Sequence, residues 1–367
     1  MYDAATRAVG AAALATAALK DAIVDRSKRY TSDRARLGSP RDQRADLAAR
    51  AAFFTIADAM KVTVPIDELI SRGALPVGRP LRVLDVGAGC GAMSLGLIAS
   101  LDPSIRLEIT AIDQSADALA IARAATATFA AARGIQLAFT THTQDVRTLP
   151  STTVDVVTLG SVLNELPDGD RLAVVQRALS AIASDGAVIV IEPALRETSR
   201  ALHVVRDAII ERGIGHVFAP CTRSVAPCPA LVDERDWCHE DRPLQLPPRT
   251  AELARLTHLR DSGMKFAYLV VRKTPLPLVD AGNAWRVVSA PMPAKGKLEV
   301  IGCSTAGRMP LRLLRRHRSA GNRAFERADR GDVVIVDASP HDDRVEITDA
   351  TKVERLRPAD DPRNATE

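Results

Sequence analysis

The chain has 367 residues, of which 46% are hydrophobic and 26% are charged; this balance is typical of a soluble globular protein and excludes collagen-like and disordered chains. Forty-nine basic residues against 45 acidic ones leave a net charge of only +4, so the overall charge does not define a partner. No apolar run approaches the roughly 18 to 20 residues that a membrane-spanning helix needs, and we expect no membrane partner.

The first 75 residues alternate alanine, leucine and charged side chains in a helical rhythm, as in RADLAARAAFFTIADAMK. We predict a helical N-terminal region over residues 1–75 that acts as a lid or docking segment. Asp3, Asp21 and Asp25 fit neither a signal peptide nor an acid-poor mitochondrial presequence. We therefore expect a cytoplasmic, bacterial-type location.

Between residues 76 and 273, strand-like and helix-like stretches alternate, which predicts an α/β core with a Rossmann-like parallel sheet covered on both faces. A cysteine-rich segment at about 214–262 interrupts this core as an insertion. The strand-like stretches are LRVLDV, RLEITAID, QLAFTT, VDVVTLG, GAVIVIE and KFAYLVVRK.

A glycine-rich loop, VLDVGAGCGAMS from Val83 to Ser94, joins the first of these strands to a helix. Glycines allow a tight turn and let backbone amides approach a ligand. An acid at the end of the next strand, Asp113, is placed to accept hydrogen bonds from ribose hydroxyls. The candidate cofactor-binding residues are Asp85, Gly87, Gly89, Gly91, Asp113 and Asp145.

The DxGxGxG form of this loop resembles motif I of class I S-adenosylmethionine-dependent methyltransferases. The resemblance implies S-adenosylmethionine as cofactor and an adenine contact near Asp145. A Rossmann-like core that has lost its ligand is the alternative.

The type of methyl transfer is constrained by what the sequence lacks. The Asn/Asp-Pro-Pro-Tyr/Phe motif of amino methylation is replaced by LGSVLNELP, and residues 62–264 contain no lysine for a Lys-Asp-Lys-Glu ribose methylation site. Cytosine C5 methylation needs a thiolate, yet Cys90 lies inside the glycine loop, where a small turn-filling residue is expected. Asn164 and Glu165 either orient a substrate or cap the next helix, and no catalytic residue is assigned.

Three of the five cysteines, Cys221, Cys228 and Cys238, fall within eighteen residues. Their spacing is too irregular for paired CxxC zinc knuckles, and a fourth ligand is needed for a tetrahedral zinc site or an iron-sulfur cube. Cys303 is preferred over His239, because two adjacent residues ligate one metal only with awkward geometry. Unrelated buried thiols are the alternative.

Beyond residue 280 the pattern changes to short strand candidates divided by proline and glycine, which predicts a small basic β domain over 280–337 and a flexible tail over 338–367. The stretch from Arg308 to Arg330 contains eight arginines and two acidic residues, which gives it a local charge of +6. This charge suits RNA phosphates, although a solvated charged face is the alternative. The candidate RNA-binding residues are Arg308, Arg312, Arg315, Arg316, Arg318 and Arg323.

Several motifs occur together: APC, CP and DWCH followed by KFAYLVVRK, with VLDVGAGCG, VLNELP followed by Arg171, and VIVIEP. As a set they resemble the methyltransferase-like proteins of the small ribosomal subunit, a family found in mitochondria and in many bacteria. The resemblance covers about residues 40–337. Cys90 stands where the family often has proline, and CHE at Cys238–Glu240 stands where the family has CHF.

This resemblance implies a class I methyltransferase fold, a role in assembling the small ribosomal subunit, and a 4Fe-4S cluster held by Cys221, Cys228, Cys238 and Cys303. The leading hypothesis is a monomeric assembly factor that binds S-adenosylmethionine, carries the cluster and docks on small-subunit ribosomal RNA, with or without methyl transfer. An active S-adenosylmethionine-dependent rRNA methyltransferase is one alternative, and a zinc-stabilised small-molecule methyltransferase is a weaker one. Composition alone does not separate the iron-sulfur cluster from zinc.

Overall fold

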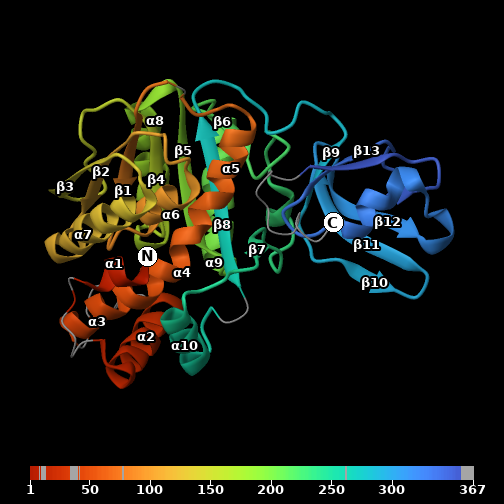
Figure 1. The fold of residues 1–367 in the computed structure, drawn as a ribbon. Coiled ribbons are helices and arrows are strands. Elements are labelled where there is room, and N and C mark those ends of the chain that lie inside the picture. The colour runs from red at the N-terminus through yellow and green to blue at the C-terminus, as the bar shows by residue number, and fades with distance from the viewer. Residues whose placement is uncertain are drawn as a thin grey trace.

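A computed structural model describes residues 1–7, 9, 14–33, 40, 42–76, 78–260 and 263–356. An α/β core carries the N-terminal helices, and a smaller β domain lies beside the β6–β8 edge of its sheet (Figure 1). The helices are α1 (Tyr2–Thr6), α2 (Thr16–Thr31), α3 (Gln43–Ala49), α4 (Thr55–Ala59), α5 (Thr63–Ser71), α6 (Ala92–Ser100), α7 (Ala116–Arg133), α8 (Asp168–Ala181), α9 (Arg196–Glu211) and α10 (Pro248–Thr257).

The core contains an eight-stranded sheet with the strand order β3-β2-β1-β4-β5-β8-β6, and β7 pairs with β8. Strands β1 to β5 run parallel, whereas β8 runs antiparallel to both of its neighbours. The strands are β1 (Leu81–Val86), β2 (Leu107–Asp113), β3 (Leu137–Thr143), β4 (Val154–Gly160), β5 (Ile182–Pro193), β6 (His216–Ala219), β7 (Glu240–Arg242) and β8 (Met264–Arg272). The Rossmann-like class I methyltransferase fold predicted from the sequence is confirmed.

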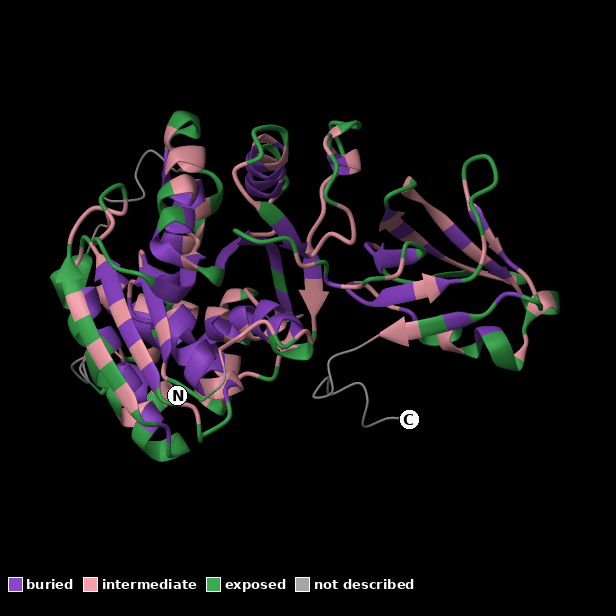
Figure 2. Cartoon of the chain, turned by 90° about the horizontal axis from the view of Figure 1, so that it is seen from above, coloured by how far each residue is buried: buried purple, intermediate pink, exposed green. Residues whose placement is uncertain are grey.

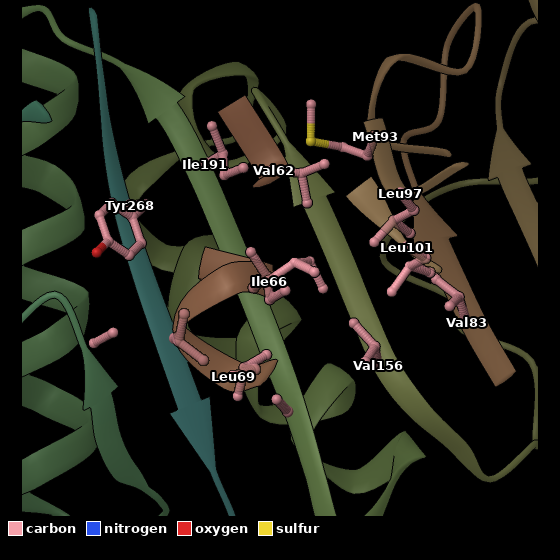
Figure 3. Close-up of a cluster of buried hydrophobic side chains, with 14 of the residues drawn as sticks. Val62, Ile66, Leu69, Val83, Met93, Leu97, Leu101, Val156, Ile191 and Tyr268 are labelled. Carbon is pink, nitrogen blue, oxygen red and sulfur yellow. The ribbon is translucent and has the colours of Figure 1, made fainter. Parts of the chain in front are cut away.

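The central strands are apolar along their whole length because helices cover both faces of the sheet. Successive side chains of a strand point to opposite faces, so Val83 and Val156 pack with α5 and α6 (Figure 3). Their neighbours Leu84 and Val157 belong instead to the cluster formed with α8 and α9. The order of the strands reverses between β1 and β4, and a ligand crevice lies at such a switch point.

The N-terminal helices pack directly on the core. Ile66 and Leu69 of α5 are fully buried in the same cluster as the central strands. Farther out, Leu19 and Ile23 of α2 pack against Leu253 of α10, so the insertion and the N-terminus share a core. The domain boundaries drawn from the sequence remain predictions.

The β domain is built on a second sheet with the order β14-β12-β11-β9-β13-β15, with β10 paired to β11. Trp285, Leu311 and Phe325 are buried in its own core, and the burial colours in Figure 2 show this interior separated from that of the larger sheet. Its strands are β9 (Ala284–Val287), β10 (Met292–Ala294), β11 (Lys297–Ser304), β12 (Gly307–Leu314), β13 (Val333–Val336), β14 (Val345–Ile347) and β15 (Val353–Leu356).

The prediction of a flexible tail from residue 338 is wrong for residues 338–356, which the structure describes. Strand β14 pairs with β12 and β15 pairs with β13. Val345 and Ile347 are buried in the core of the β domain, so a few apolar residues in a polar stretch suffice to hold two short strands. Residues 357–367 of the predicted tail lie outside the described residues.

Within the described ranges, no helix is long and apolar enough to cross a membrane.

Candidate functional site

The glycine loop leaves β1 and enters α6 with Gly87, Gly89 and Gly91 at φ values of 66°, 53° and 89°. Glycine tolerates these left-handed conformations at no steric cost. A side chain would also collide with its surroundings: a Cβ on Gly87 would lie 2.5 Å from Val162 Cγ2, and one on Gly91 would lie 3.1 Å from Ala122 Cβ. Only glycine therefore fits these three positions, which lie at the switch point of the sheet.

Asp113, at the end of β2, holds this loop in place. Its Oδ2 accepts a hydrogen bond from the Gly89 amide at 2.8 Å, and its Oδ1 accepts one from the Ser115 amide at 2.8 Å. Each carboxylate oxygen has a second lone pair, and the side chain is only half-buried. Asp113 thus has acceptor capacity left for the hydroxyls of a bound nucleoside.

The other two acids of the predicted set lie in different surroundings. Asp85 is fully buried and accepts hydrogen bonds from Ser94 Oγ at 2.6 Å and Thr158 Oγ1 at 2.9 Å, so its role is to support the loop from behind. Asp145 is half-buried near the end of β3 and accepts hydrogen bonds from Gln114 Nε2 at 2.9 Å and the Arg147 amide at 2.7 Å.

Helix α2 reaches across to the segment that follows β4. The Tyr30 hydroxyl donates to Glu165 Oε1 at 3.1 Å and accepts a hydrogen bond from Arg26 Nη2 at 2.7 Å. Helix α8 begins with no side-chain cap, so neither Asn164 nor Glu165 has the predicted capping role.

A cavity of about 540 Å³ borders the carboxyl ends of β4 and β5. Glu192, one of its lining residues, is 1% exposed and accepts hydrogen bonds from the Leu163 and Asn164 amides at 2.9 and 3.1 Å. Burial raises the pKa of Glu192 to about 7. Asn164 also lines the cavity, and its Nδ2 is buried without a hydrogen-bond partner among the described residues.

The cysteines Cys221, Cys228, Cys238 and Cys303 all line one small cavity of about 40 Å³. The first three come from the insertion, whereas Cys303 lies on β11 of the β domain. The two segments are also joined by a hydrogen bond from Thr222 Oγ1 to the Cys303 carbonyl at 3.2 Å. Four residues spread over more than eighty positions of sequence therefore meet where the core and the β domain join.

Of the four cysteines that line this cavity, Cys228 is buried and the other three are half-buried. Burial raises the pKa of Cys228 to about 11 and that of Cys303 to about 12, and the neighbouring cysteines act in the same direction. Burial also raises the pKa of Cys238 well above its usual value. Within the described ranges, no group of three or more His, Cys, Asp or Glu side chains is close enough to hold one metal ion.

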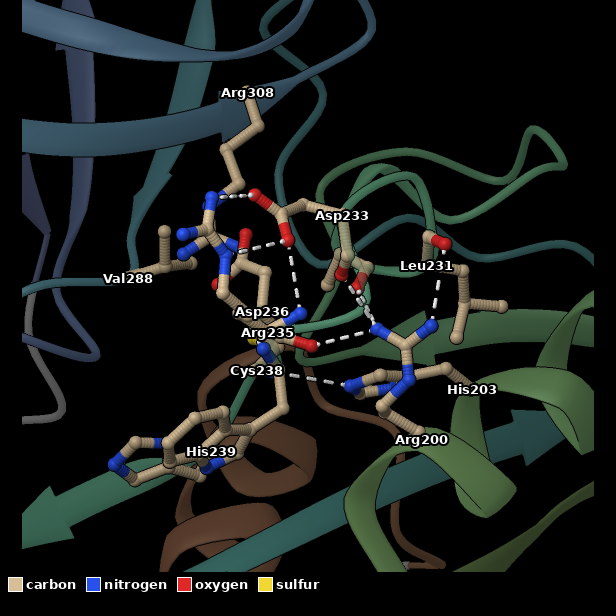
Figure 4. Close-up of polar contacts among 12 residues, drawn as sticks. Arg200, His203, Leu231, Asp233, Arg235, Asp236, Cys238, His239, Val288 and Arg308 are labelled. Atoms are coloured by element: carbon tan, nitrogen blue, oxygen red, sulfur yellow. Dashed lines mark hydrogen bonds and ion pairs between the residues drawn. The ribbon is translucent and has the colours of Figure 1, made fainter. Parts of the chain in front are cut away.

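Helix α9 supplies two polar residues, His203 and Arg206, to the lining of the cysteine cavity. Arg206 is 2% exposed, and its Nε donates to Cys221 Sγ at 3.3 Å. His203 Nε2 accepts a hydrogen bond from the Cys238 amide at 3.2 Å (Figure 4). Because burial lowers the pKa of His203 to about 4, its imidazole is neutral at pH 7, as this acceptor role requires.

His239, the alternative fourth ligand, is not among the residues that line the cavity. Its ring stacks on Trp237 with the ring centroids 5.7 Å apart.

Helix α9 also fixes the loop between Cys228 and Cys238. The Arg200 guanidinium donates to the carbonyls of Ala230, Leu231, Asp233 and Asp236 at 2.7 to 3.3 Å (Figure 4). A single side chain from the core thereby organises the backbone between two of the cysteines.

The family model of the mitochondrial small ribosomal subunit protein Rsm22 matches residues 55–334, which is more than half of the chain. The chain belongs to the Rsm22 family. No match is found among the curated proteins.

Among solved structures, the S-adenosylmethionine complex of magnesium protoporphyrin IX methyltransferase from Synechocystis PCC 6803 is 16% identical, with a TM-score of 0.38 over 69% of this chain and 97% of that one. Its S-adenosylhomocysteine complex is 15% identical, with a TM-score of 0.39 over 69% and 100% of the two chains. A S-adenosylmethionine-dependent methyltransferase from Leishmania major is 17% identical, with a TM-score of 0.30 over 48% and 61%.

The six candidate RNA-binding arginines of this Rsm22-family chain divide into two groups. Arg308 lines the cysteine cavity and pairs with Asp236, and Arg312 pairs with Glu299 at 2.7 Å. The exposed group lies on and around two 3₁₀ turns of the β domain; it comprises Arg315, Arg316, Arg318 and Arg323. Of these, only Arg318 has an acidic partner among the described residues, Glu326 at 3.3 Å.

The sequence analysis did not identify the charged and polar residues that lie next to the glycine loop and the cysteine cavity. Arg50, Arg206 and His203 lie in helical segments of ordinary composition, at no recognisable motif, and only tertiary packing brings them to the glycine loop or the cysteine cavity. An invariant buried arginine in an alignment of relatives is the signal that would reveal them.

Proposed function

We propose that this Rsm22-family protein is an assembly factor of the small ribosomal subunit that binds S-adenosylmethionine, carries a 4Fe-4S cluster and docks on ribosomal RNA through its β domain. The observation that carries the proposal is the convergence of four cysteines, distant in sequence, on one cavity between the core and the β domain. The family description names the mitochondrial small ribosomal subunit, so a cytoplasmic location stays a prediction.

The residues present fit an iron-sulfur cluster in their chemistry. Cysteine thiolates are the standard ligands of such clusters, and Cys221, Cys228, Cys238 and Cys303 would hold the four irons. A bound cluster would supply a covalent tie between the insertion and β11. The buried guanidinium of Arg206 beside Cys221 would offset the negative charge that thiolate ligands bring into the interior.

Four cysteine thiols form a ligand set that suits either an iron-sulfur cluster or a tetrahedral zinc site. Each cysteine of a cube binds a different iron, which suits four thiols arranged around a cavity. Zinc remains the alternative that metal analysis decides.

The experiment is metal analysis with an absorption spectrum on protein purified without oxygen. We expect about four irons per chain, broad visible absorbance, and loss of both in Cys303→Ser, because this substitution removes the only ligand on the β domain. Cys90→Ser is the matched control, since Cys90 is buried in the glycine loop and does not line the cysteine cavity. Stoichiometric zinc would contradict the iron-sulfur cluster, and full iron in Cys303→Ser would contradict the ligand assignment.

An active rRNA methyltransferase is the second candidate, and one observation favours it. The cavity of about 540 Å³ is lined by Glu192 and by Asn164, whose side-chain Nδ2 has no hydrogen-bond partner among the described residues, and these groups could contact a methyl-accepting base. Transfer of labelled methyl groups to small-subunit RNA, abolished in Asp113→Ala, would establish this activity. A blank with every purified assembly intermediate would leave the binding role alone.

A further inference from the structure

Arg50 is the first residue of the π-helical turn Arg50–Phe54, which continues directly from α3. Short π-helical segments inside α-helices are found frequently at functional sites. Its Nη2 lies only 2.9 Å from the place where a Cβ on Gly89 would stand. The guanidinium of the N-terminal region therefore lies against the backbone of the glycine loop, and glycine at position 89 leaves it the room.

The charge of Arg50 acts on the groups that border this loop. Burial raises the pKa of Cys90, and the nearby charges of Arg50 and Arg26 oppose that increase. Burial also raises the pKa of Tyr30 to about 12, and the same two arginines again oppose it. Arg50 thus lies within electrostatic reach of both the loop and the Tyr30–Glu165 contact.

The two arginines differ in their partners. Arg26 Nη1 donates to both carboxylate oxygens of Asp46 at 2.8 and 3.1 Å, and Arg26 Nη2 donates to the Tyr30 hydroxyl. The side chain of Arg50 has no hydrogen bond or ion pair with any described residue. Arg50 is therefore the cation at the glycine loop whose donors remain available.

We propose that Arg50 binds the carboxylate at the amino-acid end of the ligand held by the glycine loop. This inference rests on the proposed binding of S-adenosylmethionine. A guanidinium is a planar fork that matches a carboxylate with two parallel hydrogen bonds. The Asp113 acceptor at the end of β2 and the Arg50 donor of the N-terminal region both lie at Gly89, an arrangement that suits a ligand with ribose hydroxyls and a carboxylate.

The test compares two ligands that differ at the carboxylate end. S-adenosylhomocysteine carries the amino-acid group, whereas 5′-methylthioadenosine keeps the nucleoside and the sulfur but lacks that group. Titration calorimetry on the full chain should show that Arg50→Ala weakens S-adenosylhomocysteine binding on the order of 10- to 100-fold. Binding of 5′-methylthioadenosine should not change. Arg50→Lys should be intermediate, because it keeps the charge and loses the fork.

Arg44→Ala is the matched control, since Arg44 is an exposed residue of the adjacent α3; it should bind both ligands like the wild type. The 5′-methylthioadenosine titration also shows whether the nucleoside-binding part of each variant is still folded. If Arg50→Ala lost affinity equally for both ligands, or lost none for S-adenosylhomocysteine, the proposed role of Arg50 would be wrong. The proposed binding of S-adenosylmethionine would still stand. A wild-type chain that binds neither ligand would overturn the cofactor part of the proposed function, and this inference with it.

Discussion

Asp85 shows how a single residue of the glycine loop is set by its surroundings. The side chain is fully buried, and both of its oxygens accept hydrogen bonds from hydroxyl groups. Burial nevertheless dominates and raises its pKa from 3.8 to about 6. The two hydroxyls therefore do not fully replace the water that an ionised carboxylate loses.

This shift predicts a pH-dependent contribution to stability. The folded protein binds more protons at Asp85 than the unfolded chain between about pH 4 and pH 6. The free energy of unfolding from this group should therefore rise as the pH falls through 6, and the full penalty, on the order of 3 kcal/mol, should be present at pH 8. Asp85→Asn should remove that dependence and be at least as stable as the wild type at pH 8.

Urea denaturation at pH 5, 6, 7 and 8 measures the effect as a difference between the variant and the wild type. Asp117→Asn, an exposed carboxylate on α7, is the control. Equal pH slopes for Asp85→Asn and the wild type would contradict the assignment.

The two 3₁₀ turns of the β domain, Arg315–His317 and Ala320–Arg327, carry the exposed Arg315, Arg316 and Arg323, which have no acidic partner among the described residues. The second turn is anchored by a capping box between Ser319 and Asn322. Asn322 is fully buried, and its Nδ2 donates to the carbonyls of His317 and Thr348 at 2.8 Å. The exposed arginines thus stand on an anchored backbone, which would reduce the entropy lost in the RNA contacts proposed for them.

We predict that replacing Arg315, Arg316 and Arg323 together by alanine weakens binding to small-subunit RNA on the order of 10- to 100-fold. The slope of log affinity against log salt should fall by about 3 if each arginine contacts one phosphate, because each phosphate contact releases nearly one counterion. Filter binding or fluorescence anisotropy between 50 and 200 mM salt, concentrations at which this dependence is steep, measures both quantities. Arg312→Ala should have a smaller effect because Arg312 is already paired with Glu299. An unchanged slope in the triple variant would place the RNA surface elsewhere.

Elements with strong local signals could be predicted from the sequence. β1 and β4 were visible as apolar runs because both faces of a parallel sheet are buried, and Gly87, Gly89 and Gly91 indicated the turn between β1 and α6. β14 and β15 were not predicted, because their short segments are strands only through pairing with β12 and β13. The position of Arg50 over Gly89 likewise depends on contacts between elements forty residues apart, which no local pattern records.

A buried polar cluster, here called the polar hub, consists of Glu68, Tyr268 and Arg286. It joins the N-terminal helices, the sheet and the β domain. Arg286 of β9 is 3% exposed and donates to Glu68 Oε1 of α5 at 2.6 Å. The Tyr268 hydroxyl of β8 donates to Glu68 Oε2 at 2.7 Å, and Arg286 also donates to the carbonyls of Pro220 and Gly331 at 2.7 and 2.6 Å. Because Arg286 also lines the cysteine cavity, the hub and the four thiols together connect the β domain to the core.

Removing the Glu68 carboxylate while keeping Arg286 should lower the free energy of unfolding substantially. Glu68→Gln removes the acid that is hydrogen-bonded to the buried Arg286 and leaves only the more distant charge of Glu240; breaking a buried ion pair destabilises a protein by about 3 to 5 kcal/mol. The double variant Glu68→Gln with Arg286→Met should recover a large part of that loss, because it removes the buried charge as well as its partner. Tyr268→Phe should cost only about 1 kcal/mol, since it removes one hydrogen bond. Guanidinium denaturation gives the three free energies, and small-angle scattering reports whether the β domain separates from the core. A Glu68→Gln variant within 1 kcal/mol of the wild type, or a double variant less stable than the single one, would contradict the view that Arg286 depends on Glu68.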